Sequence, residues 1–175
     1  MAQQSSTKDL YDAVTKGDVA AVKKIVESGK ADLNAFSPVG IFESETPLFA
    51  ASFKGNKEIV SLLVSKGAKV ELGDNSLHGA ASKDNVEILE VLVKAGLSVN
   101  SKSYVSASLV AINLLQPKQF GDTPLHIASY FGRVASVEEL LRLGADKSIK
   151  NNLGKTAHDI AEARGQSMVS RLVKI

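Results

Sequence analysis

The sequence, 175 residues long, predicts an all-α fold: a solenoid of about five tandem helix-turn-helix units. The first observation is a recurring segment, TPLFAA at 46–51, NSLHGA at 75–80 and TPLHIA at 123–128. The second is a turn residue that follows each copy at a fixed spacing, and in most copies a closing glycine follows that turn residue at a second fixed spacing. The third is an apolar stripe between these two positions that is too wide for a helix with one wet face.

Two weaker copies, which begin near Lys8 and Thr156, complete the series. The turn positions hold Gly17, Gly55, Asp84, Gly132 and Gly165, and the closing glycines are Gly29, Gly67, Gly96 and Gly144. The expected single domain, 1–175, therefore divides into units at 7–36, 45–71, 75–102, 121–150 and 154–175.

Each unit is expected to start with a short helix. Thr46 and Thr123 can accept a hydrogen bond from a free amide of the first turn, and the proline that follows has no amide to leave unpaired. The second helix of a unit carries runs such as IVSLLV at 59–64, so it must lie between neighbours, and its closing glycine can take the left-handed conformation.

Small residues recur on the first helices, where they let helices approach closely. The alanines in question are Ala13, Ala50, Ala51, Ala80, Ala81 and Ala128. A large side chain at Ala51 should cost roughly 1 to 3 kcal/mol through overpacking.

At this point the chain resembles the ankyrin-repeat family. The likeness rests on TPLHIA at 123–128, the turn glycine, the second helix and Gly144-Ala145-Asp146, and it extends over nearly the whole sequence. The resemblance implies an L-shaped stack of helix pairs with β-hairpin fingers between units. It also implies a concave face, made of fingers and first helices, that binds other proteins.

Three connections depart from a regular repeat. The first is longer and has an acidic tip with Phe42, Glu43 and Glu45, which is either a loosely ordered hairpin or an enlarged finger that contacts a partner. The second, from 71 to 75, is short, and a truncated finger is expected there. It either has no functional consequence or leaves a notch in the binding face.

The largest departure is an insertion at 103–119. Val105, Leu109 and Ile112 share one helical face, which predicts one additional short helix that ends before Pro117. This helix either packs its apolar side on the array or, with Tyr104, grips a partner.

Enzyme chemistry is not expected. The chain has no cysteine and three histidines, each in a different expected helix, so no metal triad or serine hydrolase arrangement is supported. No phosphate-binding glycine loop occurs either, and we expect no catalytic, cofactor or metal site. The resemblance implies that His78 and His126 bond nearby backbone or the cap hydroxyl. His158, one position earlier in its unit, is expected to be structural as well.

The family register places the two residues before each turn glycine in the concave groove. The candidate partner-binding residues there are Lys16, Phe53, Lys54, Lys83, Tyr130 and Phe131. The three rings are expected to be exposed anchors, although Phe53 or Phe131 alternatively tucks under a finger. The lysines form either a basic ladder for an acidic segment or a solvated face.

The expected function is a non-catalytic protein-interaction module, either an inhibitor or regulatory subunit or an adaptor, whose partner the sequence does not identify. The 21 basic and 19 acidic residues nearly cancel, which disfavours nucleic acid and membrane surfaces. The alternative is a nucleic-acid-binding accessory protein that uses the groove lysines and aromatics. We expect a complete, monomeric, cytoplasmic or nuclear protein with polar end units and no small-molecule substrate.

Overall fold

The computed structural model describes residues 2–36, 46–70, 75–103 and 121–175. Every helix and connection discussed below lies within these ranges, and no strand occurs among them. The described helices form five pairs: α1 (Ala2–Lys16) with α2 (Val19–Glu27), α3 (Pro47–Lys54) with α4 (Lys57–Ser65), α5 (Ser76–Ser82) with α6 (Val86–Lys94), α8 (Pro124–Phe131) with α9 (Val134–Arg142), and α10 (Ala157–Ala163) with α11 (Ser167–Val173).

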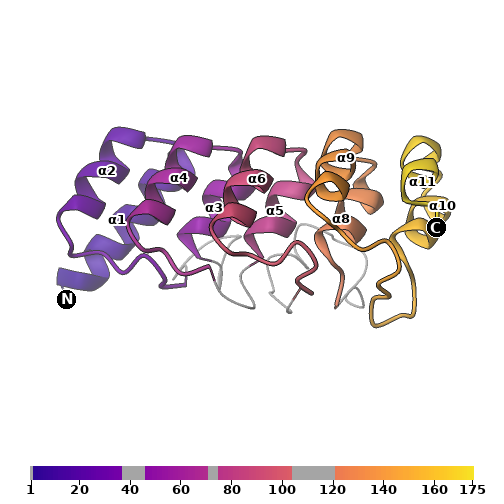
Figure 1. The fold of residues 1–175 in the computed structure, drawn as a ribbon. Coiled ribbons are helices and arrows are strands. Elements are labelled where there is room, and N and C mark those ends of the chain that lie inside the picture. Colours follow the sequence, from indigo (N-terminus) through magenta and orange to yellow (C-terminus); the bar gives the residue numbers. More distant parts are fainter. Residues whose placement is uncertain (1, 37–45, 71–74, 104–120) are drawn as a thin grey trace.

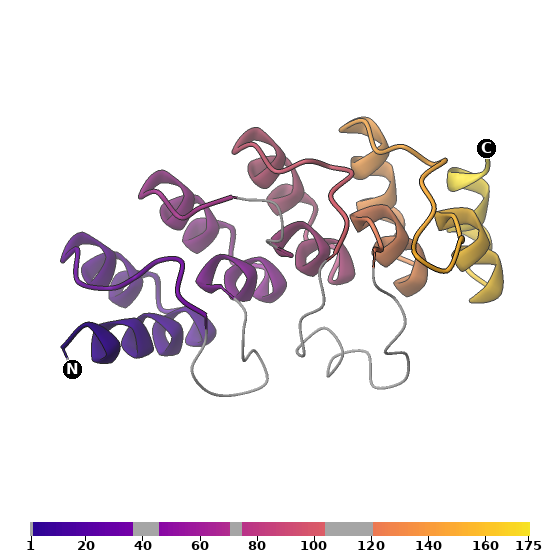
Figure 2. The ribbon, with the colours of Figure 1, turned by 90° about the horizontal axis from the view of Figure 1, so that it is seen from below.

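The pairs stand in a row and form two layers (Figure 1). The first helices, α1, α3, α5, α8 and α10, pack against one another in that order, and the second helices, α2, α4, α6, α9 and α11, do the same. Figure 2 shows that the row curves gently, with the first helices on its inner side. The helical solenoid is therefore confirmed, and α1 begins ahead of residue 7, where the first unit was expected to start.

The helix starts follow the predicted capping chemistry. Thr46 Oγ1 accepts a hydrogen bond from Phe49 N at 3.1 Å, with Pro47 at the next position. Asn56 Oδ1 does the same for Ile59 N at the start of α4, at 3.0 Å. Gly55 joins the two helices with φ +80°, a left-handed conformation that disfavours any residue with a Cβ.

The core lies between the layers and between successive units. Ala50, Ala51, Ala80, Ala81 and Ala128 have no exposed surface, which confirms that small residues allow the first helices to approach. Phe49 is the largest fully buried side chain, and a Cβ at the position of Gly79 on α5 would lie 3.1 Å from its ring. Close contact between α3 and α5 therefore depends on a glycine there.

Asp84 locks the third and fourth units together. It is the one residue other than glycine in the described ranges with a positive φ, at +63°, and it occupies the predicted turn position. Its carboxylate accepts a hydrogen bond from Ser136 N in α9 at 2.7 Å. Arg133, the residue before α9, has no acceptor in its side chain, so a neighbouring unit supplies the cap.

The same two units are also joined at the base of the connection between them. Ser103 N donates to Asp122 O at 2.8 Å, and Gly121 N donates to Ser103 O at 3.3 Å. The backbone on either side of 104–120 is therefore held together by two hydrogen bonds.

Several sequence predictions lie outside the described residues: the finger tip with Phe42, Glu43 and Glu45, the short connection at 71–74, and the insertion with Tyr104. The β-hairpin fingers and the inserted helix stay predictions. The charged residues of the last unit are exposed as expected, and Met168 and Ile175 are exposed beside them, at 64% and 78%.

Candidate partner-binding surface

The groove residues chosen from the sequence lie together at one end of the first helices. Lys16 and Lys54 are the last residues of α1 and α3, and Lys83 directly follows α5; all three are exposed. Tyr130 and Phe131 end α8. The three rings are half-buried rather than exposed as expected, because each packs against a side chain of its own or the next unit.

Phe53 links the second unit to the third. Its ring stacks on that of Phe49, with centroids 6.0 Å apart and planes at 16°. The ammonium of Lys83, from the next unit, lies 4.6 Å from the Phe53 ring centroid. Such a cation–π contact is worth about 0.5 to 1 kcal/mol at exposed sites, and it holds the ring in one orientation.

Tyr130 makes the equivalent link between the fourth and fifth units. The Cζ atom of Arg164 lies 3.7 Å from its ring centroid, and an Arg164 Nη2–H donates to Tyr130 Oη. Tyr130 also meets Phe131 edge to face, with centroids 5.0 Å apart. The guanidinium therefore lies over the face of this ring and also bonds its hydroxyl, which restricts the orientation of the ring.

Arg133 closes the gap between these two clusters. Its Nε donates to Ser82 O, the residue before Lys83, at 2.8 Å, and its Cζ lies 5.9 Å from the Phe131 ring centroid. Rings and cations thus follow one another from the second unit to the fifth. We call this set the cation–aromatic strip: Phe53, Lys83, Arg133, Phe131, Tyr130 and Arg164.

The sequence register placed Arg164 at a groove position but did not select it as a partner-binding residue, and it missed Arg133 altogether. Arg164 occupies the same register position as Lys83, directly before the turn glycine of its unit, so the repeat itself contained the signal. Arg133 follows a turn glycine, where Asn56 caps its own helix in an earlier unit. A capping side chain must accept a hydrogen bond, which arginine cannot do, so an arginine at this position indicates that its side chain has another role.

In the second, third and fourth units, the acidic residues of the helices all lie on the second helices. The helices α3, α5 and α8 contain no Asp or Glu, whereas the second helices of the same units hold Glu58, Glu87, Glu90, Glu138 and Glu139. Ion pairs form on that outer side, with Lys57–Glu87 at 3.0 Å, Lys94–Glu90 at 2.9 Å and Arg142–Glu139 at 2.7 Å. The strip cations form no ion pair with any residue in the described ranges.

The histidines have the structural role that was expected. His126 Nε2 donates to Lys155 O at 2.9 Å, while its Nδ1 accepts from the Thr123 hydroxyl at 2.8 Å. His78 Nε2 donates to Asp122 O at 3.0 Å. Burial lowers the pKa of His78 to about 4 and also lowers that of His126, so both rings are neutral at pH 7.

Asp122 lies beneath these rings and is almost fully buried. Burial raises the pKa of its carboxyl to about 6, although Asn151 Nδ2 donates to Oδ1 at 2.8 Å and thereby opposes the shift. The described residues contain no cluster of three or more ligating side chains that suits a metal ion. No helix in the described ranges is long and apolar enough to span a membrane.

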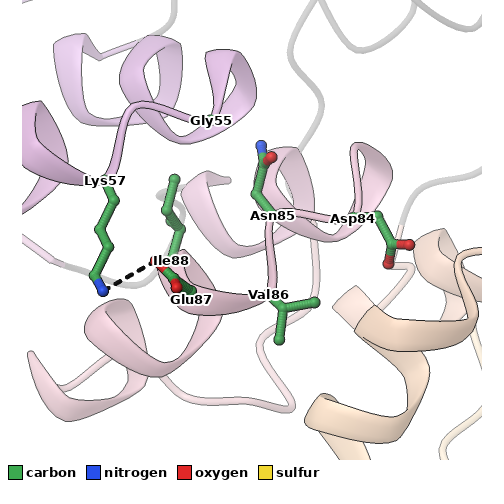
Figure 3. A pocket seen from close by; sticks show the side chains of 7 residues that line it. All are labelled: Gly55, Lys57, Asp84, Asn85, Val86, Glu87 and Ile88. Carbon is green, nitrogen blue, oxygen red and sulfur yellow. Dashed lines mark ion pairs between the residues drawn. The ribbon is translucent and has the colours of Figure 1, made fainter.

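One open pocket of about 280 Å³ lies where the turn of the second unit meets the start of α6 (Figure 3). Its polar side chains already have partners: Asn85 Nδ2 donates to Ser52 O at 2.8 Å, and Lys57 pairs with Glu87. The pocket is lined by Gly55, Lys57, Asp84, Asn85, Val86, Glu87 and Ile88.

Stacked helix pairs with capped first helices, left-handed turns and a buried histidine network define a helical repeat protein. Family models agree: one for ankyrin repeats in three copies matches residues 10–103, and one for a single ankyrin repeat matches 120–152. The chain belongs to the ankyrin-repeat family. Ankyrin repeats are in general protein-interaction domains, and the repeats of this chain form a protein-interaction module.

Curated relatives share the repeats within very different proteins. The chain is 36% identical over 157 residues to the E3 ubiquitin-protein ligase Ufd4 of Drosophila melanogaster, covering 90% of this chain and 4% of the relative. It is 31% identical to alpha-latrotoxin-Lg1a of Latrodectus geometricus, covering 77% and 9%. It is also 31% identical to ankyrin repeat and SOCS box protein 11 of Danio rerio, covering 66% and 35%. The chain thus spans at most about a third of these relatives, and they share its scaffold.

Proposed function

We propose that this chain binds a partner protein along the inner face of the array, without catalysis, and that the cation–aromatic strip is the centre of the interface. The strip carries the proposal because it combines half-exposed rings with cations at the same end of successive first helices. Aromatic and arginine side chains supply much of the energy at protein interfaces.

The rings of the strip are held in place before a partner arrives. Lys83 covers one face of Phe53, and Arg164 covers Tyr130 and bonds its hydroxyl. A side chain that is already ordered loses less rotamer entropy on binding, so these contacts favour affinity as well as stability. Lys16 and Lys54 extend the surface toward the first two units.

The test is affinity capture from the native cell with the double substitution Phe53→Ala and Tyr130→Ala. We expect binding to weaken at least about tenfold, because a buried aromatic anchor contributes roughly 2 kcal/mol or more. The matched control is Leu153→Ala with Met168→Ala, which truncates two exposed apolar side chains, one just before the last unit and one within it, and should leave capture unchanged. Unchanged capture with the strip variant, while the helical circular dichroism is preserved, contradicts the proposal.

The module acts either as an inhibitor or regulatory subunit that covers one partner's active surface, or as an adaptor that joins two partners. In the adaptor case the insertion at 103–119 with Tyr104, or the finger tip with Phe42, Glu43 and Glu45, provides the second contact. Capture after replacement of 104–119 by a short linker separates the two. Loss of one partner while another stays bound supports the adaptor, and loss of the one partner that the chain has supports the inhibitor.

We place this activity in a monomer in the cytoplasm or nucleus. Sedimentation of the purified chain and imaging of a tagged copy test these two statements. A concentration-dependent dimer contradicts the first, and a tagged copy confined to another compartment contradicts the second.

A further inference from the structure

We infer that the partner segment on the cation–aromatic strip is an acidic stretch of protein in an extended conformation, whose carboxylates meet Lys83, Arg133 and Arg164. This inference rests on the proposed function, since it names the chemistry of the partner at that surface.

The first step is charge. The whole chain has a net charge of only +2, yet the three central first helices have no carboxylate, and the outer helices of the same units hold five glutamates. Asp84, which directly follows Lys83, caps α9 by accepting a hydrogen bond from Ser136 N. Lys83 and Arg164 are exposed, and neither forms an ion pair with a described residue. The strip therefore presents cations that form no ion pair with a described carboxylate, and an acidic ligand complements them.

The second step is spacing. The three cations belong to the third, fourth and fifth units, and packed helices lie about 8 to 10 Å apart. Three residues of a chain in the extended polyproline II conformation complete one turn, return to the same face and cover about 9 Å. A carboxylate at every third residue of the partner thus reaches one cation in each successive unit. The rings between the cations contact the apolar side chains that separate those carboxylates.

The third step separates a protein from a nucleic acid, which is also a polyanion. Single-stranded nucleic acid binds by stacking bases on open aromatic faces. Here Lys83 lies over the face of Phe53 and Arg164 over the face of Tyr130, so a base would have to displace the cation it needs. A carboxylate can approach the same cations from the solvent side and leave both cation–π contacts intact.

The experiment uses the full chain and two labelled twelve-residue peptides in a fluorescence anisotropy titration. One peptide has glutamate at every third position with leucine and serine between, and the other has lysine in place of each glutamate. We expect the acidic peptide to bind preferentially and to weaken as salt screens the contact. The variant Lys83→Glu with Arg164→Glu should weaken it at least about tenfold, as expected for charged anchors.

The matched control is Lys66→Glu with Arg171→Glu. Lys66 and Arg171 are exposed cations at the ends of the outer helices α4 and α11, and their reversal changes the net charge equally. We expect the control to keep the acidic peptide's affinity within about twofold. An equal loss in both variants shows that net charge alone attracts the peptide, and it overturns the inference, as does the absence of any preference for the acidic peptide.

Two further outcomes complete the test. A labelled oligothymidylate that binds more tightly than the acidic peptide, and is lost with Lys83→Glu and Arg164→Glu, assigns the strip to nucleic acid and overturns the inference. Capture of the native partner separates the proposed interface from the acidic character inferred for the partner. If the charge reversal retains a partner that Phe53→Ala with Tyr130→Ala loses, the interface stands and its acidic character is refuted; if neither variant loses it, the proposed function fails.

Discussion

Asp84 offers a quantitative test of how neighbouring units hold each other. Its carboxylate caps α9 across the unit boundary, through the 2.7 Å hydrogen bond from Ser136 N, and its φ of +63° is unfavourable for any residue with a Cβ. Three substitutions separate these two contributions. Asp84→Asn retains an acceptor oxygen and tolerates the left-handed conformation, Asp84→Gly removes the cap but relieves the backbone, and Asp84→Ala removes the cap and relieves nothing.

The expected magnitudes follow from the geometry. Loss of an N-cap costs about 0.5 to 2 kcal/mol, and loss of a negative charge at a helix N-terminus costs a further 0.3 to 1 kcal/mol or so. Arg133 has no acceptor with which to replace the cap. Asp84→Ala should therefore destabilise by about 2 kcal/mol. Asp84→Gly should destabilise about 1 kcal/mol less, because glycine carries no left-handed penalty, and Asp84→Asn by roughly 0.5 kcal/mol.

Urea unfolding followed by circular dichroism at 222 nm measures the series, and thermal unfolding checks it. For a chain of this size, 2 kcal/mol corresponds to a melting temperature about 4 to 8 °C lower. The predicted order of stability is wild type, Asn, Gly, Ala. A glycine variant less stable than the alanine variant, or an alanine variant that matches wild type, would refute the assignment of Asp84 as the cap of α9.

Two other predictions concern the interior. Because burial raises the pKa of Asp122 to about 6 from an ordinary value of 3.8, its contribution to stability is lost as pH rises through that window. The stability advantage of Asp122→Asn over wild type should therefore grow between pH 4 and 7, to at most about 3 kcal/mol. A difference in urea midpoint between the variant and wild type that is the same at both pH values would contradict this. The pKa of His78 is lowered to about 4 from 6.5, so the stability that its neutral ring contributes is lost as pH falls. The Asp122→Asn variant lacks the opposing effect of Asp122, and it should therefore lose stability steeply on acidification below pH 6.5. Ala51→Leu should destabilise by roughly 1 to 3 kcal/mol, because Ala51 has no exposed surface, and a neutral result in urea unfolding would show that the α3–α5 contact has room.

The fold was largely predictable because each repeat carries its own local signals. Thr46 with Pro47, the turn at Gly55 and the small residues at Ala50 and Ala51 depend on backbone rules that hold within one unit, and the structure confirms them. The wide apolar stripe at 59–64 correctly indicated a helix sandwiched between neighbours. The turn position of Asp84 was also predicted, although no glycine marks it.

The surface was less predictable because it depends on contacts between units. The half-buried state of Phe53 follows from Phe49, one turn earlier in the same helix, and from Lys83 of the next unit, which is distant in sequence. Arg133 looked like an ordinary residue after a turn, and its bond to Ser82 O requires knowledge of how the third and fourth units pack. Register alone placed the groove residues, whereas their exposure and their cation partners required three-dimensional structure.

The two backbone hydrogen bonds among Ser103, Gly121 and Asp122 have a consequence for how such an array diversifies. They join the residues on either side of 104–120 directly, beside the contact of α5 with α8. The entropy of closing a loop grows only with the logarithm of its length, at about 0.6 kcal/mol for each doubling. A change in the length of this segment therefore adds little to the free energy of closing the chain, and the stack of helices tolerates it.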